Sequence, residues 1–143
     1  MRSVAAPLWN TGAVSDGWRV DAEEVLSDLQ AKVSARDLAG LIGFFEDPAV
    51  LIGTAGDGRT SDGRREYLTA VTTQPGALRW DWHDIALFYE TDDALGFAAF
   101  GEVVLTNDSE ELRAPIRATL LAVRAQDGWR IRQFHGSIPQ TPT

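Results

Sequence analysis

The chain has 143 residues, 44% of them hydrophobic, which is enough for one globular domain with a buried core. Its net charge of −8 repels a phosphate backbone, so nucleic acid is a poor partner. The absence of cysteine excludes disulfides, thiolate nucleophiles and cysteine-based metal sites. No apolar run is long enough to span a membrane, and residues 1–20 lack the apolar core of a signal peptide. We therefore expect a cytoplasmic protein that has no membrane partner.

The first half of the chain has the residue spacing of helices. Asp21 and Glu24 predict a capping box, in which the two side chains satisfy free backbone amides at a helix start. Apolar residues then recur every three or four positions, and further start signals lie at Asp37 and at residues 61–62. We expect helices over about residues 22–35, from Asp37 to before Pro48, and over about residues 61–73, with a short buried strand over residues 49–53.

A glycine-rich loop over residues 54–60 precedes the third predicted helix. Asp57 is the acid in this loop, where the sequence Gly-Asp-Gly is first of all a turn former. The loop lacks the Lys-Ser/Thr ending of a phosphate-binding loop. The two histidines are far apart and no spaced set of three carboxylates occurs, so we expect neither a metal nor a cofactor.

From Leu78 onward the hydrophobic pattern changes to the period of two that is typical of strands. Strands are predicted over residues 79–90, 94–106, 112–125 and 128–136. Because short polar turns join them, the four strands should form an antiparallel meander. Helices followed by strands is the α+β order, in which helices cover one face of a sheet.

The closing strand, GWRIRQFHGS over residues 128–137, resembles the last strand of SnoaL-like domains in the nuclear transport factor 2-like superfamily. Two other passages are similar to that family, FFEDPAV over residues 44–50 and SDGRREYL over residues 61–68. The resemblance implies an α+β fold in which a cone-shaped, strongly bent antiparallel sheet has three N-terminal helices packed on its concave face. It implies a domain over residues 21–139, a partly ordered arm over residues 1–20 that contains two tryptophans, and a tail over residues 140–143.

Both histidines are candidate catalytic residues. The resemblance places His135 near the mouth of the cone, where its imidazole could be a general base or a hydrogen-bond donor. Alternatively, His135 bonds to backbone and holds the edge of the sheet. His83 follows Asp81 by two residues, so a regular strand puts both on one face, where the carboxylate could fix the imidazole tautomer. The alternative is a solvated strand start whose tryptophans pack on the sheet or on a dimer face.

Glu102 interrupts an apolar strand, and burial would raise its pKa unless a cation pairs with it. Arg117 should lie roughly opposite on the next strand, which predicts a cross-strand ion pair. Otherwise Glu102 is a pocket acid, with Phe100 lining the cavity on the same face. Trp82 and Phe134 are the remaining candidate ligand-binding residues. Strand register decides which side chains face inward, and a slip of one residue reverses them.

The resemblance implies functions of two classes. Polyketide cyclases, ketosteroid isomerases and dehydratases among the relatives imply a small organic ligand and a cofactor-independent isomerase, cyclase or lyase that uses general acid/base chemistry. No catalytic Asp and no Tyr–Asp pair of those enzymes can be matched in this chain. Association domains among the relatives imply instead a non-catalytic dimerisation module. In both cases we expect a homodimer through the outer face of the sheet, because residues 117–123 are apolar on both faces.

Overall fold

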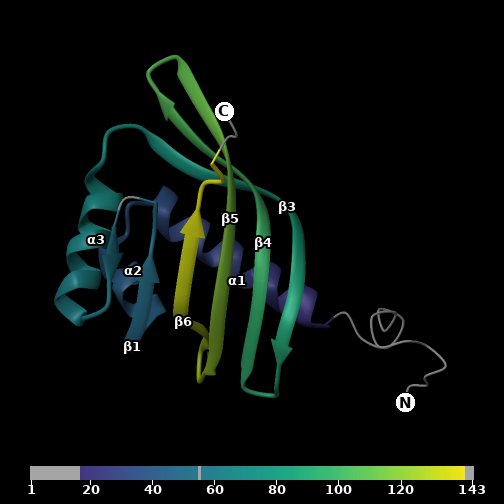
Figure 1. Cartoon of the computed structure of the whole chain (residues 1–143). Helices are drawn as coiled ribbons and strands as arrows, with labels where there is room; N and C mark the ends of the chain where they lie inside the picture. Colours follow the sequence, from purple (N-terminus) through teal and green to yellow (C-terminus); the bar gives the residue numbers. More distant parts are fainter. Residues whose placement is uncertain (1–16, 55, 141–143) are drawn as a thin grey trace.

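The computed structural model describes residues 17–54 and 56–140, which form three helices and one six-stranded sheet (Figure 1). The strands lie in the order β2-β1-β6-β5-β4-β3. The helices are α1 (Gly17–Ser34), α2 (Leu38–Phe44) and α3 (Ser61–Thr73). The strands are β1 (Phe45–Ile52), β2 (Asp57–Gly58), β3 (Ala77–Glu90), β4 (Ala94–Asn107), β5 (Glu110–Ala125) and β6 (Gly128–Ser137). The predicted α+β class is confirmed.

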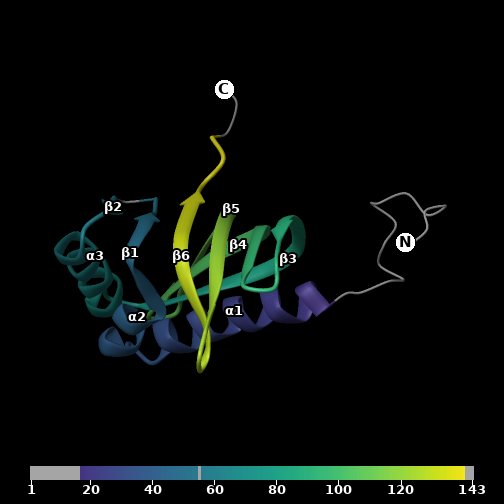
Figure 2. The same ribbon diagram turned by 90° about the horizontal axis from the view of Figure 1, so that it is seen from below.

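The sheet is strongly curved and wraps around α1. Strands β3 to β6 form the predicted antiparallel meander, and β1 joins its far side by pairing in parallel with β6. The sheet is therefore mixed at that side. Figure 2 shows α1 running along the concave face, with α3 beside β1 and β2. The space between the helices and the concave face contains the core.

The start of α1 differs from the prediction. The helix begins at Gly17, so Asp21 lies inside it and does not cap it. The predicted capping box is therefore wrong, and Asp21 instead forms an ion pair with Arg124 at 3.9 Å. Because residues 17–20 are helical, Trp18 packs against the core. The other tryptophan of the predicted arm, Trp9, lies outside the described residues.

The other two helix starts follow the sequence closely. The carboxylate of Asp37 accepts a hydrogen bond of 2.9 Å from the amide of Gly40, so Asp37 caps α2 as predicted. The cap of α3 is Thr60, which directly precedes the two predicted candidates, Ser61 and Asp62, and its hydroxyl accepts a hydrogen bond of 3.0 Å from the amide of Gly63. Side chains of both types satisfy amides that have no partner inside the helix.

A bulge in β6 keeps three apolar side chains on the core face. Trp129 and Ile131 are buried, as their alternation predicts, and Phe134 is buried although it lies three residues further. The pairing with β5 shifts by one residue at Arg132. Because a bulge sets two residues opposite one, it reverses the alternation beyond Arg132 and turns His135 toward the convex face.

The buried core joins the helices to the concave face of the sheet. Its largest fully buried side chains are Phe97, Leu41, Leu95, Leu120, Ile131, Val25 and Val104. Within the described residues, no helix is long and apolar enough to cross a membrane.

Candidate ligand-binding cavity

A cavity of about 440 Å³ lies between the helices and the concave face of the sheet. Its walls are mainly apolar, and the apolar side chains come from α1, α2, α3 and every strand except the short β2. Leu29, Leu41, Leu51, Trp80, Ile116 and Phe134 are among the lining residues. A volume of this size with apolar walls is typical of sites for small molecules.

Apart from Gln74, which follows α3, the polar lining gathers at one end of the cavity. It comes from the loop after β1, where Thr54 and Gly56 lie, from Asp57 at the start of β2, and from the first turns of α3. Asp57 and Glu66 are both exposed to solvent as well as lining the cavity. The cavity therefore opens to solvent between the loop and α3.

Tyr67 is the main polar group in the wall at this end. Its ring lies against Gly53 and Gly56 of the loop. Burial raises the pKa of its hydroxyl above the ordinary value of 10.0, so the group is neutral at physiological pH. The hydroxyl makes no hydrogen bond with any other residue that the structure describes. Buried phenols usually have a hydrogen-bond partner, so this hydroxyl is free to donate to a ligand.

A buried arginine connects α3 to β1 at this end of the cavity. Arg64 is 6% exposed, and its guanidinium donates hydrogen bonds of 2.7 Å to the carbonyl of Ala49 and 2.8 Å to the carboxylate of Asp47. A side chain at Gly58 would collide with the backbone of Arg64, so β2 packs closely on α3. These contacts fix α3, and with it Tyr67, relative to β1.

The predicted pair of Asp81 and His83 is not formed. β3 contains an extra residue at His83, between the positions at which Trp82 and Asp84 pair with β4. A bulge interrupts the alternation of a strand. Asp81 consequently faces the outer surface, whereas His83 lines a groove between α1 and β3 together with Trp82. A bulge of this kind leaves no clear signal in a single sequence.

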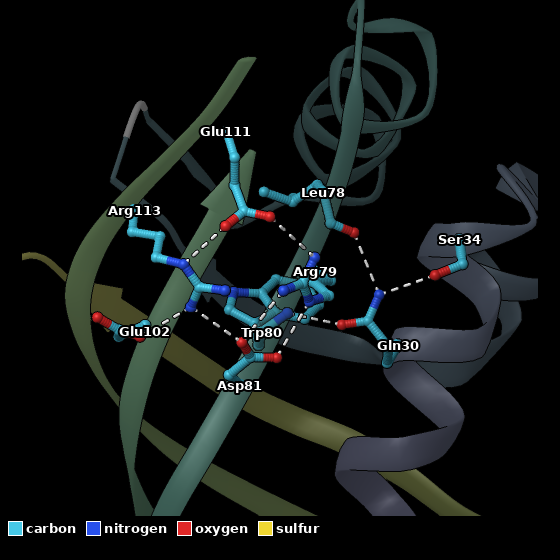
Figure 3. Close-up of polar contacts among 9 residues, drawn as sticks. All are labelled: Gln30, Ser34, Leu78, Arg79, Trp80, Asp81, Glu102, Glu111 and Arg113. Atoms are coloured by element: carbon cyan, nitrogen blue, oxygen red, sulfur yellow. Dashed lines mark hydrogen bonds and ion pairs between the residues drawn. The ribbon is translucent and has the colours of Figure 1, made fainter. Parts of the chain in front are cut away.

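Asp81 belongs to a network of charged side chains on the outer face. Arg79 donates to its carboxylate at 3.1 Å and Arg113 at 3.2 Å (Figure 3). The hydrogen bond from Arg79 is the largest cause that holds the pKa of Asp81 below its ordinary value. Arg113 also contacts Glu111 at 2.9 Å and Glu102 at 3.0 Å, and these hydrogen bonds, the one with Glu111 above all, raise the pKa of Arg113. The network ties β3, β4 and β5 together.

The predicted ion pair between Glu102 and Arg117 is wrong. The tight turn between β4 and β5 places Glu102 opposite Pro115, and Arg117 opposite Phe100. Glu102 therefore finds its cation in Arg113, two residues beyond Pro115 toward the turn. The predicted type of interaction, a carboxylate paired across the strands, is present with a different partner.

The other candidate residues lie on different surfaces. Phe134 lines the cavity, and Trp82 lies in the groove beside α1, stacked against Trp80 with 6.3 Å between ring centroids. Phe100, Arg117 and His135 face the convex side and are exposed. The catalytic roles of His83, Asp81 and His135 stay predictions.

Sequence reasoning did not single out Tyr67 as a binding residue. The signal that could have found it is its position on the apolar face of the third helix, next to a glycine-rich loop. Among the described residues, no group of three or more His, Asp or Glu side chains is arranged to hold a metal ion.

Comparison with known proteins identifies the family. Residues 22–141 match the family described as the SnoaL-like domain. No curated protein matches the chain in sequence. A proposed dehydratase of the nuclear transport factor 2-like family from Streptomyces avermitilis is 12% identical with a TM-score of 0.76, over 89% of this chain and 100% of that one.

Two further solved structures share the fold. A proposed calcium/calmodulin dependent protein kinase II association domain from Xanthomonas campestris is 15% identical with a TM-score of 0.78, over 89% of this chain and 91% of that one. A proposed scytalone dehydratase from Novosphingobium aromaticivorans is 10% identical with a TM-score of 0.74, over 94% of this chain and 91% of that one. At such low identity these similarities show the fold alone. Because the family match extends over most of the length of this chain, the chain belongs to the SnoaL-like domain family.

Proposed function

We propose that this protein binds a small, largely apolar molecule in the cavity between its helices and its sheet, with the Tyr67 hydroxyl as the ligand's main polar contact. The observation that carries the proposal is a half-buried phenol, without a hydrogen-bond partner among the described residues, in the wall of a cavity of about 440 Å³. An unsatisfied buried hydroxyl costs about 1–3 kcal/mol. A ligand that accepts a hydrogen bond from Tyr67 recovers this free energy.

The same arrangement supports cofactor-independent isomerase, cyclase or dehydratase chemistry. A neutral phenol can donate a hydrogen bond to a carbonyl oxygen as negative charge develops on it. Asp57 and Glu66, at the open end of the cavity, are carboxylates that could accept a proton from the ligand. The Streptomyces and Novosphingobium proteins, which are named as dehydratases, favour this class of reaction. An acid/base role for His83, Asp81 or His135 is a separate prediction.

A thermal-shift screen of neutral aromatic ketones, steroids and polyketides tests the binding proposal. A ligand that binds only the folded state raises the melting temperature, with about 2.7 kcal/mol of stabilisation at a hundredfold excess over its Kd. The shift should disappear in Ala70→Trp, which fills the cavity from an exposed position on α3. It should persist in Ala39→Trp, an exposed position on α2 that does not line the cavity. Equal shifts in both variants would place the ligand elsewhere.

A second candidate function is dimerisation through the convex face of the sheet. Phe100 is 43% exposed and Phe88 is 60% exposed on this face. Exposed apolar side chains that gather on one face mark surfaces for association. The Xanthomonas protein, named as an association domain, has the same fold. A homodimer through this face is compatible with ligand binding, because the cavity lies on the opposite, concave side.

A further inference from the structure

The charged side chains in the wall of the cavity are all acidic among the described residues. Asp57 and Glu66 line its open end, and no lysine, arginine or histidine of the described chain is part of the wall. Arg64 belongs to the same helix as Glu66 but lies outside the wall, and its guanidinium is occupied by Asp47 and by backbone carbonyls. A negatively charged ligand would therefore meet no counter-ion in the cavity.

Neither carboxylate is strongly neutralised by a cation among the described residues. Glu66 forms no ion pair with any residue that the structure describes. Asp57 lies 3.8 Å from Arg59, and both side chains are more than half exposed, so water screens this pair. Carboxylates in water are ionised at neutral pH. The open end of the cavity is thus negative.

The N-terminus of α3 offers little compensation for an anion. Helix N-termini carry partial positive charge, and Gly63, in the first turn of α3, lines the cavity. However, the Gly63 amide already donates to Thr60, and Asp62 adds a negative charge in the same turn. The local charge balance at the entrance remains negative.

We infer that the ligand of this cavity is an uncharged apolar molecule that carries a hydrogen-bond acceptor such as a ketone, and that the cavity discriminates against carboxylates and other anions. This inference rests on the proposed function. An anion would lose its water without gaining a cation, which is costly, and it would be repelled by Asp57 and Glu66. A neutral carbonyl avoids both costs and accepts the hydrogen bond that Tyr67 can donate.

A pair of ligands that differ in charge tests the inference. 2-Acetylnaphthalene and 2-naphthoate have the same ring system and similar size, but only the second is an anion at pH 7. Titration calorimetry at low ionic strength should show the ketone binding about tenfold more tightly, or better. In the double variant Asp57→Asn/Glu66→Gln, the affinity for naphthoate should rise several-fold, with the affinity for the ketone unchanged.

A matched control separates the local charges from the net charge of the protein. Glu24→Gln/Glu90→Gln removes the same charge from exposed positions outside the cavity and should leave both affinities unchanged. Naphthoate binding as tightly as the ketone to the wild type, or equal effects of the two double variants, would overturn the inference while leaving the cavity proposal in place. Binding of neither ligand would instead contradict the proposal that the cavity takes small apolar molecules.

Discussion

The hydroxyl of Tyr67 occupies the space into which a side chain at Gly53 would project. Gly53 directly follows β1, and Tyr67 lies in the second turn of α3, so the contact joins two separate elements. Because glycine has no Cβ, the tyrosine ring can lie over the loop and reach the cavity wall. The glycine-rich loop thus has a specific structural role, which is to make room for the phenol.

Gly53→Ala should therefore displace Tyr67. The added methyl group would collide with the hydroxyl, and relieving such overpacking costs about 1–3 kcal/mol. We expect a lower free energy of unfolding in urea, together with an affinity for a cavity ligand that is about tenfold weaker. The control is Gly43→Ala on α2, where an added Cβ meets open space. This control should be neutral or stabilising by up to about 1 kcal/mol. Wild-type affinity in Gly53→Ala would contradict the role assigned to the contact.

Gln30→Ala should loosen α1 from the edge of the sheet. The side-chain amide of Gln30 donates to the carbonyl of Leu78 at 3.1 Å and accepts from the amide of Trp80 at 2.8 Å (Figure 3). These groups belong to β3, the edge strand, whose outer side has no neighbouring strand in the described sheet. Leaving them unsatisfied should cost about 1–3 kcal/mol in urea denaturation. Gln126→Ala, in an exposed turn, should cost little, and equal losses would refute the role of Gln30.

The carboxylate of Asp81 should make stability depend on pH. The hydrogen bond from Arg79 is the largest cause of its lowered folded-state pKa, and Arg113 contributes as well. The unfolded state binds more protons between the two pKa values, so the contribution to stability is complete above the unfolded pKa. That contribution is lost as the pH falls through the folded-state pKa, below the ordinary value of 3.8.

The measurement compares the urea denaturation of the wild type and of Asp81→Asn between about pH 6 and pH 2. The wild type should be the more stable of the two near pH 6, and the difference should narrow steadily toward pH 2. High salt should also reduce the difference, because the network is partly exposed to solvent. The control is Asp92→Asn, whose carboxylate forms no ion pair within the described chain and should show no such narrowing. A difference that is constant with pH would rule out this role for Asp81.

Phe100→Glu should disrupt a dimer formed through the convex face. Phe100 and Arg117 are neighbours on this face, and His135 lies on it as well. Sedimentation should give a dimer for the wild type and a monomer for Phe100→Glu, because a buried, unpaired carboxylate is costly at an interface. Leu112→Glu is the control, since Leu112 is 57% exposed but points to the opposite side of its strand. A monomeric wild type would contradict the proposed dimer.

The four long strands could be predicted within about two residues of their ends, because polar turns separate well-alternating segments. The sequence did not predict which side chains face the cavity. The bulges at His83 and Arg132 reverse the alternation, and they result from how neighbouring strands fit together. The residue predicted opposite Glu102, Arg117, is two residues from the observed one, Pro115. The turn between β4 and β5 is tighter than expected, with Asp108 at a positive φ of 54°.

Tyr67 was not identified for a related reason. Its place on the apolar face of the third helix indicates burial, but its importance comes from contact with a loop that precedes it by more than ten residues. Phe134 faces the cavity only because of the bulge at Arg132, since regular alternation from Trp129 and Ile131 would place it on the convex face. Local chemistry therefore predicted the elements, whereas the site depends on contacts between them.

The most direct test of the central claim compares Tyr67→Phe with Tyr89→Phe in titration calorimetry with the best ligand of the thermal-shift screen. Tyr67 lines the cavity, whereas Tyr89 is exposed on the convex side. Since the Tyr67 hydroxyl has no partner among the described residues, its removal should leave stability unchanged or raise it by up to about 1–3 kcal/mol. We expect Tyr67→Phe to weaken binding about five- to tenfold, as the loss of one hydrogen bond requires, with Tyr89→Phe equal to the wild type. Wild-type affinity in Tyr67→Phe would contradict the claim that this hydroxyl contacts the ligand in the cavity.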